Sequence, residues 1–269
     1  MAGIQEARKG TSERAVIGDV VIRRCEGIEE SRMCLDLQKE VWGFSDIELV
    51  PLRLFVVAEK VGGQVLGAFD GNEMVGFALA IPGNRNGHLY FHSHMLAVRE
   101  SYRDRGLGRA IKLFQREDAL ARGVELIEWT FDPLEIKNAY LNLQRLGAIA
   151  RRYNINQYGV TTSPLQGGLP TDRLVAEWWL RSERVNAVLS GGKRPPVHTQ
   201  VCVSIPAEVY DWKARPETRT HALNVQTQAR ELMLKAFDAG MACLGYERDV
   251  EGNGKFLIGH WDEHWSYAR

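Results

Sequence analysis

Two spacings of apolar residues alternate along the chain and predict an ordered series of strands and helices. Short apolar runs bounded by turn residues favour strands, whereas apolar residues three or four positions apart favour helices. Between residues 19 and 159 the predicted order is β-α-α-β-β-β-α-β-α-β. The predicted segments are 19–25, 28–42, 51–60, 64–69, 74–81, 89–98, 107–123, 126–131, 135–146 and 149–158, with a loop at 82–87. Hairpins on one side and β-α-β crossovers on the other predict an α/β fold in which helices cover a mixed sheet.

The chain also predicts a division into domains. Residues 161–170 are rich in turn formers and interrupt the pattern. Beyond them, strands are predicted at 173–180, 197–205, 241–250 and 255–260, and helices at 182–189 and 219–239. We therefore expect a main domain over 19–160 and a smaller C-terminal α+β unit over 171–269, which could be a degenerate half-copy of the first. Residues 1–18 are charged and predict a flexible arm.

Composition narrows the class of protein without singling out a partner. Of 269 residues, 45% are hydrophobic and 25% charged, and 34 basic residues balance 34 acidic ones. This neutrality gives no indication of binding to nucleic acid or to an anionic membrane. The four cysteines form no C-x-x-C pair, and no apolar segment is typical of a signal peptide or a membrane span. We expect a cytoplasmic protein.

The candidate chemistry centres on one strand, loop and helix. The apolar strand end Leu96-Ala97-Val98 leads into a loop with Arg103, Arg105, Gly106 and Gly108, after which the helix pattern begins. A helix start offers backbone N–H groups and partial positive charge, which favour a phosphate or diphosphate. The loop lacks the Gly-Lys-Ser/Thr of a P-loop and the G-x-G-x-x-G of dinucleotide-binding proteins.

The combination R-x-x-G-x-G after L-A-V resembles the acyl-CoA-binding motif of the GNAT superfamily of N-acyltransferases. The element order over 19–159 is similar to the whole GNAT core. The resemblance implies that acyl-CoA is the cosubstrate and that a small primary amine attacks its thioester directly. It also implies that the backbone of Leu96, Ala97 and Val98 pairs with the pantetheine amides. The diphosphate would then lie on the residues Arg103, Arg105, Gly106, Leu107, Gly108 and Arg109.

Two histidines precede this motif on the same strand. Side chains alternate along a strand, so His92 and His94 are expected on one face, and histidine titrates near neutral pH. The pattern H-x-H-x-L-A-V is similar to that of arylalkylamine N-acetyltransferases, which implies a general base, with His94 our first choice. As an alternative, His88, His92 and His94 could ligate a metal, but no complete ligand set is evident and we expect none.

Other candidate residues follow the motif. Glu128 is an alternative base or an anchor for the amine. GNAT proteins often carry a tyrosine acid at the position of Leu143 here, so Tyr140 is the candidate acid from a shifted position. Asn138 and Asn142 are spaced to share a helical face and could bind cofactor or substrate.

A narrower resemblance covers residues 88–159. The segments TFDPL, NA, LN, LGA and YG look like a bacterial subgroup of longer GNAT proteins, some of which are linked to N-succinylation of amino acids. This implies an amino-acid acceptor and succinyl-CoA as a donor beside acetyl-CoA, with Arg53, Arg151 or Arg152 meeting the second carboxylate. An acyl-CoA-binding protein without turnover remains the alternative. The C-terminal unit could complete a substrate pocket or form a homodimer contact.

Overall fold

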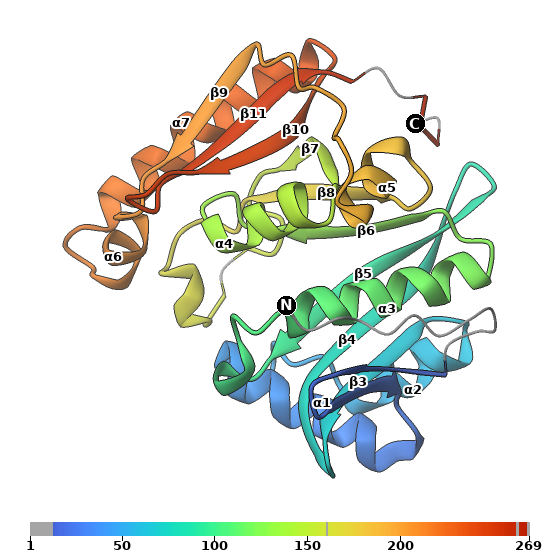
Figure 1. Ribbon diagram of the computed structural model, residues 1–269. Coiled ribbons are helices and arrows are strands. Elements are labelled where there is room, and N and C mark those ends of the chain that lie inside the picture. The colour runs from blue at the N-terminus through green and yellow to red at the C-terminus, as the bar shows by residue number, and fades with distance from the viewer. Residues whose placement is uncertain (1–12, 160, 262–263, 268–269) are drawn as a thin grey trace. The chain divides into compact units, whose positions relative to one another are not determined.

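The computed structural model describes residues 13–159, 161–261 and 264–267, and the chain divides into two compact units (Figure 1). The first unit runs to Ile127 and includes Tyr267, and the second runs from Glu128 to Ser266. Strands and helices alternate in both units, which confirms the predicted α/β class. Within the described residues, no helix is both long and apolar enough to cross a membrane.

The first unit is built on a sheet of consecutive antiparallel pairs. Its strands, in spatial as in chain order, are β1 (Arg14–Ile17), β2 (Val20–Arg24), β3 (Gln64–Asp70), β4 (Glu73–Arg85) and β5 (His88–Val98). Strands β3 and β4 are joined by a tight turn at Gly71, whose φ of 58° suits a residue without a side chain.

Helices cover both faces of this sheet. Helices α1 (Gly27–Trp42) and α2 (Leu52–Lys60) pack over a core that includes Phe55, Phe77 and Met95. Helix α3 (Leu107–Ala121), which follows a short 3₁₀ turn η1 (Glu100–Tyr102), packs on the opposite face. Strand β5 therefore lies between two cores, and alternate residues along it contribute to one or the other.

The second unit is also built on strands, and the boundary between the units falls within β6 (Leu126–Phe131). The strand order in this unit is β6-β8-β7-β10-β11-β9. Its other elements are α4 (Ile136–Ala139), the π-helical segment η2 (Tyr140–Arg145), β7 (Ile149–Asn154), η3 (Pro164–Gln166), β8 (Arg173–Trp179), α5 (Glu183–Ser190), β9 (Val201–Ile205), α6 (Val209–Ala214), α7 (Arg219–Asp238), β10 (Met241–Arg248) and β11 (Gly254–His260).

Strand pairing crosses the domain boundary that we expected at the turn-rich segment 161–170. Strand β7 pairs antiparallel with both β8 and β10, so residues beyond 171 share a sheet with β7 of the expected main domain. Local patterns show where strands lie but not which distant strands pair. At the other end, Arg14–Ile17 forms β1 inside the arm expected over 1–18, and residues 1–12 lie outside the described part.

The loop predicted at 82–87 is wrong, because β4 continues as a strand to Arg85. The actual turn is formed by Asn86 and Gly87, which both have positive φ. Proline and glycine at positions 82 and 83 favoured a loop in the sequence. Strand β3 pairs with β4 only as far as Ala80, so on that side Pro82 lies beyond the paired part of β4, as an edge position tolerates proline.

Candidate functional site

The loop after β5 forms the predicted start of α3. Gly106, at the N-terminal cap, has a φ of 84°, and its carbonyl accepts the first intrahelical hydrogen bond from Ala110 N at 3.0 Å. Arg103 Nε donates to Val98 O at 3.1 Å and folds the loop back onto the strand end. Helix geometry leaves the N–H groups of Leu107 and Gly108 without intrahelical acceptors. The loop therefore has the backbone arrangement of an anion site at a fifteen-residue helix.

The remaining predicted loop residues differ in which of their groups a ligand could contact. The Leu107 side chain is buried in the core beneath α3, so only its backbone can meet a ligand. Arg105 is exposed and its guanidinium lies 5.4 Å from the centre of the Tyr102 ring. A Cβ at Gly108 would lie 3.7 Å from Leu96 and 3.8 Å from Val98, which is ordinary contact. Helix α3 thus packs directly on the end of β5.

A β-bulge interrupts β5 at His94. Leu79 pairs with Met95 while Ala80 pairs with Ser93, so two consecutive residues of β4 face three of β5. His94 is the extra residue, and bulges of this kind re-aim a side chain and end regular pairing. The sequence carried no turn or glycine signal for this irregularity.

The two histidines lie side by side, as expected. The ring centroids of His92 and His94 are 6.2 Å apart. His94 is exposed, yet the surrounding protein desolvates the imidazolium and lowers the pKa of His94 below its usual range. A lowered pKa keeps more of this side chain neutral at pH 7, the form that can accept a proton.

Beneath the bulge lies a buried polar cluster that the sequence reasoning missed. Lys112 Nζ donates to Ser93 Oγ at 2.8 Å, and the Ser93 hydroxyl donates to Gln115 Oε1 at 3.1 Å. All three side chains are buried. The available signal was the helical spacing of Gly108, Lys112 and Gln115, which places a lysine on the buried face of α3.

Residues 32–141 match the model of the Acetyltransferase (GNAT) family. The matched segment starts in α1 and contains the His92–His94 pair, the bulge and the loop before α3. Residues 32–141 therefore correspond to a GNAT acetyltransferase domain, the kind of domain that acyl-CoA-dependent N-acyltransferases share.

Among solved structures, several acetyltransferases resemble the chain at low identity. The ribosomal-protein-S18-alanine N-acetyltransferase of Escherichia coli is 15% identical, has a TM-score of 0.49, and is matched over 61% of this chain and 95% of its own. An Elizabethkingia anophelis GNAT acetyltransferase with acetyl-CoA bound is 13% identical, with a TM-score of 0.44 over 61% and 99% of the two chains. One from Streptococcus pneumoniae is 15% identical, with a TM-score of 0.47 over 59% and 98%. No curated protein matches the chain.

The GNAT domain match extends past β6, where the structure places the other predicted residues in the second unit. Glu128 is buried and forms an ion pair with Arg152. Arg152 Nε also lies 3.1 Å from Glu177 Oε1, and Arg151 NH2 lies 2.8 Å from Glu177 Oε2. The carboxylates of Glu128 and Glu177 and the two arginines thus form one network of ion pairs. They give no support to Glu128 as a base or to the arginines as partners of a substrate carboxylate.

The helix with the predicted acid and amides changes its geometry at Tyr140. The α-helical turn ends at Ala139, and π-type turns follow, with Leu146 N donating to Leu141 O at 2.9 Å. Tyr140 is half-buried, and Leu143, at the family's usual tyrosine position, is fully buried. Asn138 is exposed but Asn142 is buried, so the two amides do not present one common surface.

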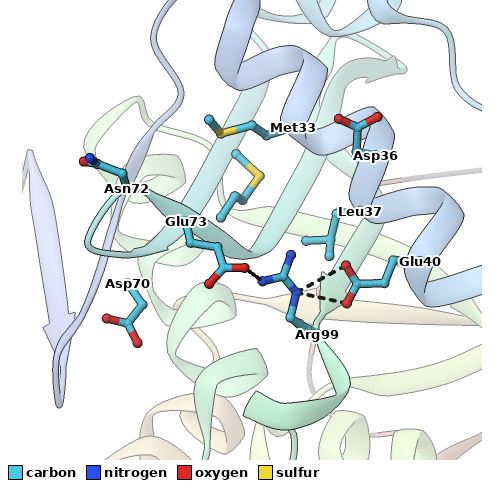
Figure 2. Close-up of a pocket in the computed structure, with 9 residues that line it drawn as sticks. Met33, Asp36, Leu37, Glu40, Asp70, Asn72, Glu73 and Arg99 are labelled. Atoms are coloured by element: carbon cyan, nitrogen blue, oxygen red, sulfur yellow. Dashed lines mark hydrogen bonds and ion pairs between the residues drawn. The ribbon is translucent and has the colours of Figure 1, made fainter.

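A pocket of about 500 Å³ opens on the first unit, and none of the predicted site residues lines it. It lies between α1 and the β3–β4 turn, and Arg99 crosses it to pair with Glu73 and, at 2.9 Å, with Glu40 (Figure 2). Asp36, Asp70 and the side chains of Met33, Leu37, Asn72 and Met74 complete its lining. Arg99, the basic residue of this lining, is therefore engaged in ion pairs with both glutamates.

Among the described residues, the structure shows no set of metal ligands that would support the alternative of a metal enzyme. No group of three or more His, Cys, Asp or Glu side chains there could hold a metal ion. His88, the third histidine of the strand, stacks instead on Tyr267, with ring centroids 4.4 Å apart.

Proposed function

We propose that the protein transfers an acyl group from acetyl-CoA or succinyl-CoA to a small primary amine, such as an amino acid, by direct attack. The observation that carries the proposal is the bulged His94 beside His92, on the strand whose end leads into the α3 loop. One continuous segment thus combines a proton acceptor with an anion site. In an acyl transfer, the anion site would bind the CoA thioester and the proton acceptor would deprotonate the amine.

The loop and strand end would hold the CoA thioester. The backbone of Leu96, Ala97 and Val98 would pair with the pantetheine amides as an added strand does. The diphosphate would lie on the N–H groups between Arg105 and Arg109, where Gly106 and Gly108 let it approach the backbone. Arg103 and Arg105 add positive charge at the loop, and both are exposed.

The histidine pair would serve the amine. The amine nitrogen attacks the thioester carbonyl carbon, a C–N bond forms, and the C–S bond then breaks. The proton lost from the amine passes to His94, directly or through water, and His92 is the second candidate for this role. The leaving thiolate takes its proton from solvent. Because the protein lowers the pKa of His94, its imidazole is available as a base at neutral pH.

The acceptor and the acyl chain are the finer parts of the proposal. An amino-acid acceptor and a succinyl donor come from the resemblance over residues 88–159. Since Arg151 and Arg152 are engaged in ion pairs, Arg53, exposed on α2, is the remaining candidate partner of a second carboxylate. Arg53→Gln should then raise the KM for succinyl-CoA and leave that for acetyl-CoA unchanged.

The test is release of free CoA thiol from acetyl-CoA or succinyl-CoA in the presence of single amines and amino acids. Amine-dependent thiol release that His94→Gln reduces supports the proposal. Binding of a thioester without thiol release by any amine would instead make the protein an acyl-CoA-binding module. His88→Gln, on the same strand, is the matched control and should retain activity.

A further inference from the structure

Along β5, side chains point alternately to the two faces of the sheet, and the extra residue at the bulge reverses which positions point to which face. This reversal brings the Ser93 side chain against α3. After the bulge, Met95 and Ala97 pack in the core under α1 and α2, whereas Leu96 and Val98 pack under α3. In an unbroken strand Ser93 would share the face of Met95. With His94 as the extra residue, Ser93 faces α3 instead.

The same reversal sets the side on which the histidines lie. His92 pairs with Ile81, which packs against the core under α1 and α2. Directly paired residues on neighbouring strands lie on the same face of a sheet. His92 therefore shares the side of Met95 although the two are an odd number of residues apart. The orientation of the histidine pair thus depends on the extra residue staying at position 94.

Two side chains of α3 hold Ser93 in this arrangement. The Ser93 hydroxyl accepts a hydrogen bond from Lys112 Nζ at 2.8 Å and donates one to Gln115 Oε1 at 3.1 Å. Ser93 and Lys112 are each only 4% exposed. Without the bulge, Ser93 would turn away, and the Lys112 amine would lose this partner in a buried place, which is costly. The contact therefore favours the bulged register.

We propose that Lys112, acting through Ser93, is a positioning residue that holds the β5 bulge and thereby orients the His92–His94 pair. The inference rests on the proposed function, because positioning matters only if the pair takes part in the transfer. Burial supports this role by lowering the pKa of Lys112 to about 7, which lets the amine lie under the sheet largely uncharged above that pH.

The kinetic test compares Lys112→Met, Ser93→Ala and the double variant with the wild type. Each single variant should lower kcat about 10- to 100-fold, since small misplacements of catalytic groups have effects of this size, and change the KM for acetyl-CoA little. The double variant should lose no more than Lys112→Met alone, because both changes remove one contact. Ser93→Thr, which keeps the hydroxyl, should restore most of the activity.

The matched control is Lys60→Met, at the exposed end of α2, which should behave as the wild type. Unchanged kcat in both Lys112→Met and Ser93→Ala would overturn the proposal. Losses that multiply in the double variant would overturn it as well. If Lys112→Met fails to fold, Ser93→Ala and Ser93→Thr carry the comparison.

A second readout separates this inference from the proposed function. NMR titration of the imidazoles of His92 and His94 needs no turnover, and Lys112→Met should shift the pKa of His94 relative to the wild type. Histidine titrations identical in both proteins would refute the positioning role. If the wild type releases no CoA thiol with any amine, the proposed function fails, whereas the titration still decides whether Lys112 orients the pair.

Discussion

His94 combines an exposed position at a β-bulge with a lowered pKa, and together these properties define its chemistry. Exposure allows an amine or a water molecule to reach the ring, and the lowered pKa keeps the ring unprotonated near pH 7. The neighbouring His92, with its ring centroid 6.2 Å away, is close enough to share the proton through water. In its proposed role as general base, such a group typically contributes about 10²- to 10⁴-fold in rate.

His94→Gln should lower kcat/KM most at and below neutral pH. In that range an amine is mainly protonated and needs a base, whereas at alkaline pH it loses its proton unaided. In the wild type, the rise of kcat/KM with pH should lie below the usual histidine range, because the native pKa is lowered. The measurement is the pH–rate profile of both proteins, with His88→Gln as control. A ratio of the two rates that stays constant over pH would remove His94 as the base.

Alanine variants of Gly106 and Gly108 should distinguish an effect on stability from an effect on acetyl-CoA binding. Gly106 has a φ of 84°, a conformation that costs other residues roughly 1–2 kcal/mol, so Gly106→Ala should lower both Tm and acetyl-CoA affinity. At Gly108 a Cβ meets only ordinary contacts, and alanine favours a helix by about 1 kcal/mol, so Gly108→Ala should keep or raise Tm.

Gly108→Ala should nevertheless weaken acetyl-CoA binding, because the diphosphate is expected to approach the backbone there. Thermal unfolding and titration calorimetry on the same preparations measure the two effects. Undiminished affinity in Gly108→Ala would place the diphosphate elsewhere.

At the scale of elements, regular patterns could be predicted and irregular ones could not. Apolar spacing located α1, α3 and most strands, since periodicity reports directly on burial of one face. The bulge at His94 and the π turns from Tyr140 add one residue to a regular ladder without a sequence signal. Strand β4 extends through a proline and a glycine that normally mark a loop. The histidine pair could therefore be predicted, but not its support by Lys112 and Ser93.

The buried Lys112 should make stability depend on pH. Its native pKa of about 7 lies below the ordinary value of 10.5, so between these values the unfolded chain binds the additional proton. Stability should then rise with pH over this range, by up to about 1.4 kcal/mol per pH unit. Lys112→Met should lack this contribution.

Urea unfolding at several pH values measures this dependence. The stability of Lys112→Met relative to the wild type should be greatest near and below pH 7 and should decrease toward pH 10.5. Parallel stability curves for the two proteins would show that Lys112 keeps an ordinary pKa in the folded state.

At the scale of the molecule, the chain divides into two compact units. The GNAT match ends at residue 141, beyond the boundary after Ile127, so the matched segment and the compact units divide the chain differently. The turn-rich segment at 161–170 suggested another boundary, because composition reports flexibility and not strand pairing. Strand β7 joins β8 and β10 across long stretches of sequence, and only the folded structure shows such pairing.

Asp172 should be a main determinant of the stability of the second unit. It is fully buried, and its carboxylate accepts hydrogen bonds from Tyr153 of β7 at 2.7 Å and from Arg230 of α7 at 2.8 Å. Asp172→Ala leaves these donors unpaired and should cost about 3 kcal/mol or more in chemical unfolding. The exposed Asp211→Ala should cost nearly nothing. Equal effects of the two variants would contradict a structural role for this cluster.

The most direct measurement is a thermal-shift titration of the whole chain with CoA, acetyl-CoA and succinyl-CoA, run in parallel on Gly106→Ala. A ligand that binds only the folded state raises Tm with concentration. We expect a saturable rise for the wild type with at least one thioester, and a weaker response for Gly106→Ala. No rise with any of the three compounds would contradict acyl-CoA binding at the α3 loop, and with it the proposed transfer.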